Sequence, residues 1–200
     1  TSMCVNAVNF GLPLVSFAFG HAALTYASIY FVTSSLILNT LGVLVASLGH
    51  LNFKQALLGL FKVPAIYAIL LAILFIQTGW TLPEPVSRTI SLAAGGAIPG
   101  MLILLGLELQ RFEWSRDLRT LSIPVFVRLV LGPIIGLGMA TLFGLQNPAS
   151  QAGITEMSGP TGVLTAVLAT EFKLDSRLVT TIVFTSTILS PLSLTLVLYF

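Results

Sequence analysis

Residues 153–163 read Gly153-Ile154-Thr155-Glu156-Met157-Ser158-Gly159-Pro160-Thr161-Gly162-Val163, and this stretch lies inside a long apolar region. Proline lacks an amide hydrogen and clashes with the preceding turn, and glycine weakens a helix. We therefore predict a helix over 149–171 that breaks partway through a bilayer. Lipid offers no partner for freed backbone groups, so broken backbone at that depth must line a protein cavity or a water-filled one. Such breaks at the midplane are where many secondary transporters hold substrate and ions.

A second stretch has the same character: Asn6-Ala7-Val8-Asn9-Phe10-Gly11-Leu12-Pro13-Leu14. We predict that the first apolar span, 3–19, is broken around Gly11 to Pro13. The helices that follow the two stretches resemble each other, since Thr33-Ser34-Ser35-Leu36-Ile37-Leu38 matches Thr185-Ser186-Thr187-Ile188-Leu189-Ser190. This weak internal symmetry is typical of the repeats from which transporters are built.

The composition indicates an integral membrane protein. The 200 residues are 56% hydrophobic and 8% charged, whereas a soluble domain carries about 25% charged residues. The nine Lys and Arg are too few and too scattered for nucleic-acid binding. The single cysteine, Cys4, excludes an internal disulfide and a cysteine-based metal site. The sequence holds no catalytic, phosphate-binding or metal-ligand motif, so we expect neither an enzyme nor a bound metal or cofactor.

The apolar pattern predicts a multi-pass protein with seven spans, at 3–19, 22–48, 63–79, 86–110, 121–145, 149–171 and 177–200. Each unbroken span suits a hydrocarbon core of ~30 Å. The loops at 49–62, 111–120 and 172–177 hold Lys54, Lys62, Arg111, Arg116, Arg119, Lys173 and Arg177, whereas the opposite loops hold only Arg88. This bias places the first set of loops in the cytoplasm. We therefore expect the protein in the cytoplasmic (plasma) membrane.

The span count predicts a fragment of a ten-helix protein with inverted repeats. Residues 1–48 would be the last two helices of the first repeat, 49–62 a cytoplasmic linker, and 63–200 the second repeat of five helices. If both halves share one plan, three helices are missing from the amino-terminal end. Because five is odd, the halves are inverted, and their two broken helices cross near the midplane. The expected fold class is thus an all-α polytopic membrane protein built on a 5+5 inverted repeat.

With these features the chain resembles the auxin efflux carrier family, which includes bacterial permeases and plant PIN-type carriers. The resemblance rests on Asn9-Phe10-Gly11-Leu12-Pro13-Leu14, on Ser158-Gly159-Pro160-Thr161-Gly162, and on Ala169-Thr170-Glu171-Phe172-Lys173-Leu174-Asp175. It implies a fold similar to that of bile-acid symporters, with helices crossing at prolines. It also implies that spans 63–79 and 86–110 form a scaffold against which a transport part moves. The implied substrates are organic anions.

The candidate binding residues lie in the two broken stretches. For a substrate we select Asn9, Gly11 and Pro13 together with Gly159, Pro160, Thr161 and Gly162; Asn6, one turn before Asn9, is a weaker candidate. Glu156 is an acid within a span, where a carboxyl group must be neutral, paired or hydrated, so we expect it to carry a coupling proton. Arg128 is the cation within a span, and three roles stay open for it: attracting an anion, pairing with Glu156 or Glu108, and snorkelling to the cytoplasmic face.

The sequence thus predicts a secondary active transporter of small organic anions that works by alternating access. Half-helix amino termini would face the substrate carboxylate. A proton as coupling ion and a homodimeric assembly in the bilayer are further expectations. The alternatives are a sodium-coupled symporter of the bile-acid type and a membrane sensor or receptor that reuses the transporter fold.

Overall fold

The computed structural model describes residues 4–38, 64–110, 118–171 and 174–199. The predicted linker at 49–62 and most of the loop at 111–120 lie outside these residues. Every regular element in the described ranges is a helix. In chain order they are η1 (Ala7–Gly11), α1 (Leu12–Ile37), α4 (Pro64–Thr78), α5 (Glu84–Gln110), α6 (Leu118–Phe126), η3 (Val127–Leu131), α7 (Gly132–Leu142), α8 (Ala149–Ser158), α9 (Leu164–Glu171) and α10 (Ser176–Tyr199).

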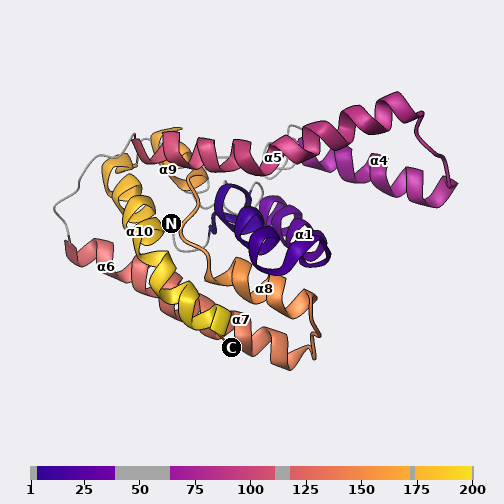
Figure 1. The fold of residues 1–200 in the computed structure, drawn as a ribbon. Helices are drawn as coiled ribbons and strands as arrows, with labels where there is room; N and C mark the ends of the chain where they lie inside the picture. The colour runs from indigo at the N-terminus through magenta and orange to yellow at the C-terminus, as the bar shows by residue number, and fades with distance from the viewer. Residues whose placement is uncertain (1–3, 39–63, 111–117, 172–173, 200) are drawn as a thin grey trace. The chain divides into compact units, whose positions relative to one another are not determined.

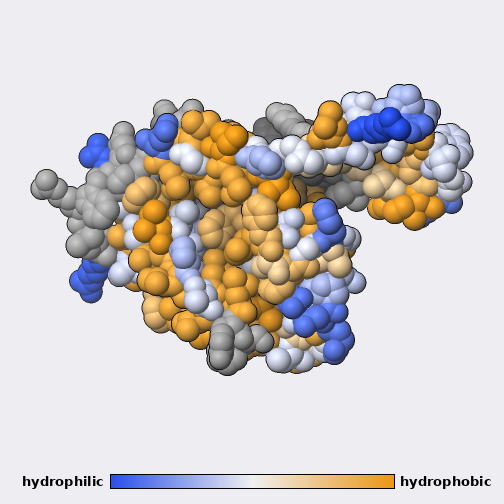
Figure 2. Space-filling model, viewed as in Figure 1, coloured by the Kyte–Doolittle hydropathy of each residue, from blue (hydrophilic) through white to orange (hydrophobic). Residues whose placement is uncertain are grey.

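The chain divides into two compact units, Thr1–Phe31 with Met101–Phe200, and Val32–Gly100. In the first unit α7 and α8 are consecutive helices packed against each other, and α10 contacts α6, η3, α8 and α9 (Figure 1). The second unit contains α4 and most of α5. Four helical stretches, Ala7–Ile37, Glu84–Leu107, Arg119–Leu142 and Ser176–Leu198, are long and apolar enough to cross a membrane. The chain is therefore an all-α polytopic membrane protein, and apolar residues cover much of the face in Figure 2.

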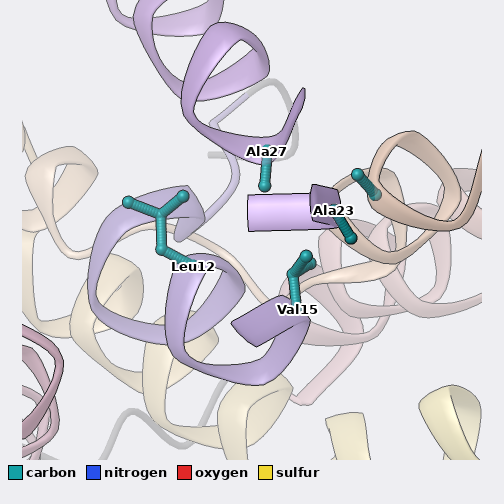
Figure 3. Close-up of a cluster of buried hydrophobic side chains, with 5 residues drawn as sticks. Leu12, Val15, Ala23 and Ala27 are labelled. Carbon is teal, nitrogen blue, oxygen red and sulfur yellow. The ribbon is translucent and has the colours of Figure 1, made fainter. Parts of the chain in front are cut away.

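The helix α1 consists of two arms joined at Gly20. This residue has φ 76° and ψ −168°, a backbone conformation that residues with a side chain rarely adopt. Leu12 and Val15 of the first arm lie next to Ala23 and Ala27 of the second (Figure 3). Small residues on one arm let the two backbones approach closely. The connection predicted at residues 20–21 is confirmed.

The prediction that the first span is broken around Gly11 to Pro13 is wrong. Residues 7–19 are helical, and the non-helical residues are Cys4–Asn6, just before them. The helix tolerates Pro13 because η1 is a π-turn: Leu12 N–H donates to the carbonyl of Ala7, five residues earlier. Local π geometry of this kind lets a membrane helix satisfy the backbone groups that proline leaves free.

A second π-turn before a proline lies in the predicted span 121–145. The π-turn η3 ends at Leu131, and the chain continues as Gly132 and Pro133 at the start of α7. Gly132 N–H donates to the carbonyl of Val127, again five residues earlier. In contrast, the break predicted at Pro160 is confirmed, because residues 159–163 are non-helical between α8 and α9.

Candidate functional site

Two non-helical segments, Cys4–Asn6 and Gly159–Val163, lie against each other, and we call them together the crossing. The amide of Asn6 donates to the carbonyl of Pro160 at 2.9 Å, and the amide of Gly162 donates to the carbonyl of Cys4 at 2.9 Å. Between these two hydrogen bonds, Val5 and Thr161 form an isolated antiparallel bridge. Each segment therefore satisfies backbone groups that the other leaves free, which broken backbone within a membrane requires.

Glycine permits the close approach at the crossing. A Cβ atom at Gly162 would lie 2.8 Å from the carbonyl oxygen of Val5, and one at Gly159 would lie 2.9 Å from Cγ2 of Val5. Both distances are shorter than real Cβ contacts. These two predicted site residues are therefore required for the backbone pairing, independently of any ligand.

Glu156 lies in the last turn of α8, and its side chain is completely buried. Its carboxyl group lies against the backbone of Gly11 in η1, because a Cβ atom at Gly11 would overlap both carboxyl oxygens. Among the residues that the structure describes, neither oxygen has a hydrogen-bond partner. The fold thus brings together two predicted site residues from opposite ends of the chain, and a surface position for Glu156 is excluded.

Arg128 lies in η3 and is 6% exposed, so it does not snorkel to the surface. Its Nε donates to the carbonyl of Gly159 at 3.2 Å, and its Nη2 donates to the carbonyl of Met157 at 3.4 Å. These carbonyls lie at the carboxyl end of α8, where helix carbonyls lack intrahelical donors and carry partial negative charge. A buried cation at this point stabilises the helix end.

The crossing itself contains further buried polar groups. Asn6 is 5% exposed and Thr161 is fully buried; within the described ranges, Nδ2 of the first and Oγ1 of the second have no hydrogen-bond partner. The amide of Thr161 donates to Oγ of Ser186 in α10 at 3.1 Å, which holds the broken segment against that helix.

The remaining predicted residues differ in their position relative to the crossing. Pro160 is fully buried within it, whereas Pro13 is fully buried inside α1 and so is not part of the break. Asn9 is half-buried in η1, and Asn6 takes the position at the crossing that the sequence analysis favoured for Asn9. Both asparagines lie next to an apolar run, which was the signal available in the sequence. Which of them lies at the break depends on the residue at which the helix begins.

Sequence reasoning missed the role of Met157. Its Sδ accepts a hydrogen bond from the Tyr30 hydroxyl at 2.9 Å. Cβ atoms added at Gly132 and Gly136 of α7 would lie 2.6 Å from its carbonyl oxygen and 2.9 Å from its Cβ. These two glycines let α7 pack closely on α8, whereas Gly138 has open space beside it among the described residues. No local pattern marks a methionine as such a contact point.

The described residues contain no group of three or more His, Cys, Asp or Glu side chains that could hold a metal ion. The site holds one carboxyl group, one guanidinium, an asparagine amide, hydroxyls, the Cys4 thiol and buried backbone at two helix ends.

Comparison with known proteins shows the family of the chain. Residues 50–198 match the family described as membrane transport protein. An uncharacterized transporter of Methanothermobacter thermautotrophicus is 29% identical over 193 residues, which cover 96% of this chain and 63% of that protein. Auxin efflux carrier component 8 of Arabidopsis thaliana is 27% identical over 124 residues, which cover 59% of this chain and 34% of that protein.

The chain thus spans less than two thirds of the length of each of these relatives. The family is one of transporters rather than enzymes, and its members are multi-pass membrane proteins that carry small molecules. Most of the chain, including α6 to α10 and hence the buried Glu156 and Arg128, lies within the matched region. The resemblance to auxin efflux carriers is confirmed, and the chain belongs to the membrane transport protein family.

Proposed function

We propose that the chain is the part of a secondary transporter that binds a small organic anion at the crossing and moves it by alternating access. The observation that carries this proposal is the backbone pairing of two non-helical segments deep in an apolar fold. Irregular backbone at membrane depth is tolerated only where it is buried in protein or lines a cavity, and many transporters hold their substrates there. The shared family supports the same interpretation.

The anionic character of the substrate is supported by the groups at the crossing. The amino-terminal end of α9 follows directly after residues 159–163, and the positive end of a helix dipole favours an anion. The orphan amide nitrogen of Asn6 is a hydrogen-bond donor suited to a carboxylate. The anion would be held by Asn6, Thr161 and the backbone of the crossing, with Asn9 in the neighbouring turn.

Glu156 is our candidate for coupling transport to protons. A buried carboxyl group without a hydrogen-bond partner in the described part of the chain is costly when ionised and gains a compensating interaction when it binds a proton or a cation. Intramembrane acids are common members of proton pathways. Because the carboxyl group touches η1, its protonation state can influence how the two segments of the crossing pack.

The division into two units supports a scaffold built from α4 and most of α5. These helices correspond to the spans at 63–79 and 86–110, which the family resemblance assigns to the scaffold. The crossing, Glu156 and Arg128 all belong to the other unit, which would be the transport part. We further propose that the protein resides in the cytoplasmic membrane as a homodimer.

The test is uptake of radiolabelled small organic anions into proteoliposomes that contain the full-length protein, with and without a proton gradient. We expect gradient-driven uptake that is lost in Glu156→Gln, since glutamine has a similar shape but cannot carry a proton. Glu84→Gln is the matched control, because Glu84 is exposed and forms an ion pair with the exposed Arg88 one turn later.

Each other result changes a stated part of the proposal. Uptake driven by a sodium gradient would favour a sodium-coupled symporter. Uptake that persists in Glu156→Gln would keep the transporter and remove Glu156 from coupling. Saturable binding of an anion without flux would replace the transporter by a sensor.

A further inference from the structure

We propose that Arg128 is a positioning residue: its guanidinium holds the carboxyl end of α8 at the crossing instead of binding the transported anion. The second half of this statement rests on the proposed function, whereas the first half concerns the fold alone. The sequence left the role of this cation open between an anion ligand, an ion pair and a residue that snorkels.

The hydrogen bonds of Arg128 carry the inference. The guanidinium donates to two backbone carbonyls that are two residues apart, those of Met157 and Gly159. The first carbonyl belongs to the last turn of α8 and the second to the non-helical segment that follows. One planar group therefore spans the point where the helix ends, which the fork geometry of arginine permits and a single ammonium does not reproduce.

Packing on the same side supports the inference independently. Gly132 lies one turn after Arg128, and an added Cβ there would lie 2.6 Å from the carbonyl oxygen of Met157. The start of α7 is thus in direct contact with the end of α8, so Arg128 reaches its carbonyls from a backbone that is already held close. A glycine beside the arginine's acceptor and a buried guanidinium indicate a built contact rather than a side chain directed at a ligand.

Electrostatics favours the same assignment. The carboxyl end of a helix carries about half a negative charge on its free carbonyls, and a buried cation there is stabilised by them. The residues held in this way directly follow Glu156, whose carboxyl group also interacts with the charge of Arg128. By fixing the end of α8, Arg128 fixes where Glu156 meets Gly11 and where residues 159–162 meet Cys4–Asn6.

Cys4 provides a reporter for this role, because it is 8% exposed and its carbonyl accepts the amide of Gly162. In the full-length protein with Cys4 as its sole cysteine, we would measure the rate of labelling by N-ethylmaleimide for Arg128→Gln, Arg128→Lys and the control Arg119→Gln. Arg119 is an exposed arginine on α6 of the same unit.

We expect Arg128→Gln to label at least about tenfold faster than the parent, since a charge-assisted hydrogen bond contributes roughly that factor to an opening equilibrium. The labelling rate of Arg128→Lys should lie between those of the parent and Arg128→Gln, because lysine keeps the positive charge but lacks the planar guanidinium that donates to both carbonyls. Arg119→Gln should label like the parent. If Arg128→Gln does not fold, faster labelling of Arg128→Lys supports the proposal and an unchanged rate contradicts it.

Anion uptake by the same variants separates positioning from substrate binding. A positioning role predicts a lower maximal rate in Arg128→Lys with KM within about threefold of the parent. Parental labelling together with a KM raised about tenfold or more, the factor for one lost charged contact to the ligand, would overturn the proposal. If no anion is carried by any variant, the proposed function fails while the labelling rates still decide whether Arg128 holds α8.

Discussion

Glycines at the crossing and glycines in α5 serve different purposes. Cβ atoms at Gly159 and Gly162 would collide with Val5, whereas Cβ atoms at Gly95 and Gly96 would meet no described atom within 4 Å. In α5 the residue type only lowers helix propensity, and small residues are common in membrane helices. At the crossing, glycine determines whether two backbone segments can come into contact.

The burial of side chains shows the same contrast. Ile76 of α4 and Leu92 of α5 are 80% and 81% exposed, although both are apolar, and Glu156 is 0% exposed although it is an acid. In a membrane protein an exposed apolar side chain can face lipid, so hydropathy marks which helices enter the bilayer and does not mark the core. The buried core contains apolar side chains such as Val15 and Ile182 together with polar groups enclosed by close backbone contacts.

The largest effect should follow from Gly162→Ala. The new Cβ would lie 2.8 Å from a backbone carbonyl, and neither backbone can move without losing the hydrogen bond between Gly162 and Cys4. We expect about 3 kcal/mol of destabilisation, at the upper end for overpacking, and loss of transport. Thermal unfolding of the purified protein in detergent measures the destabilisation. A melting temperature equal to that of the parent would show that the crossing is looser than the contacts indicate.

Gly11→Ala should have the next largest effect. It forces the Glu156 carboxyl group to move, which is easier than moving backbone, but that side chain is fully buried and has little room. We expect a loss of about 1–3 kcal/mol. Glu156→Ala removes the obstructing group, so the double variant should recover part of the loss. Additive effects of the two substitutions would mean that these residues are not coupled.

A smaller effect is expected for Gly136→Ala in α7, where the Cβ would lie 2.9 Å from Cβ of Met157. Helix α8 can shift slightly, and alanine has the higher helix propensity, so we expect about 1 kcal/mol of destabilisation. Gly138→Ala, two residues along the same helix, meets open space among the described residues and should be neutral or slightly stabilising. Equal melting temperatures for the two variants would contradict the packing of α7 on α8.

The smallest effect should come from Tyr30→Phe. This substitution keeps the ring and removes only the hydroxyl that donates to Sδ of Met157. We expect a loss of about 0.5–1 kcal/mol, because sulfur is a weak acceptor and the net contribution of a hydrogen bond is modest. Chemical or thermal unfolding measures it, with Tyr26→Phe as the control, since Tyr26 is exposed on the same arm of α1. If Tyr26→Phe loses more stability than Tyr30→Phe, the hydrogen bond from Tyr30 does not help to hold Met157 in place.

By itself the sequence determined the class of protein, the helices and one of the two breaks. These properties are local: hydropathy over about 20 residues places a helix in a membrane, and proline together with glycine weakens one. The break at Pro160 follows from the proline and the glycines at 159 and 162, and Gly20 could be predicted as a connection because it lies between two apolar spans.

Only the tertiary structure decided where the first segment is non-helical and what Arg128 does. Pro13 has the same local effect as Pro160, yet a π-turn absorbs it, while Cys4–Asn6 leaves the helix because Pro160–Gly162 supplies its hydrogen bonds from the far end of the chain. Likewise the free carbonyls that accept from Arg128 exist only because α8 ends beside η3. Backbone groups in a membrane must find partners, and which partner is available is a property of the whole fold.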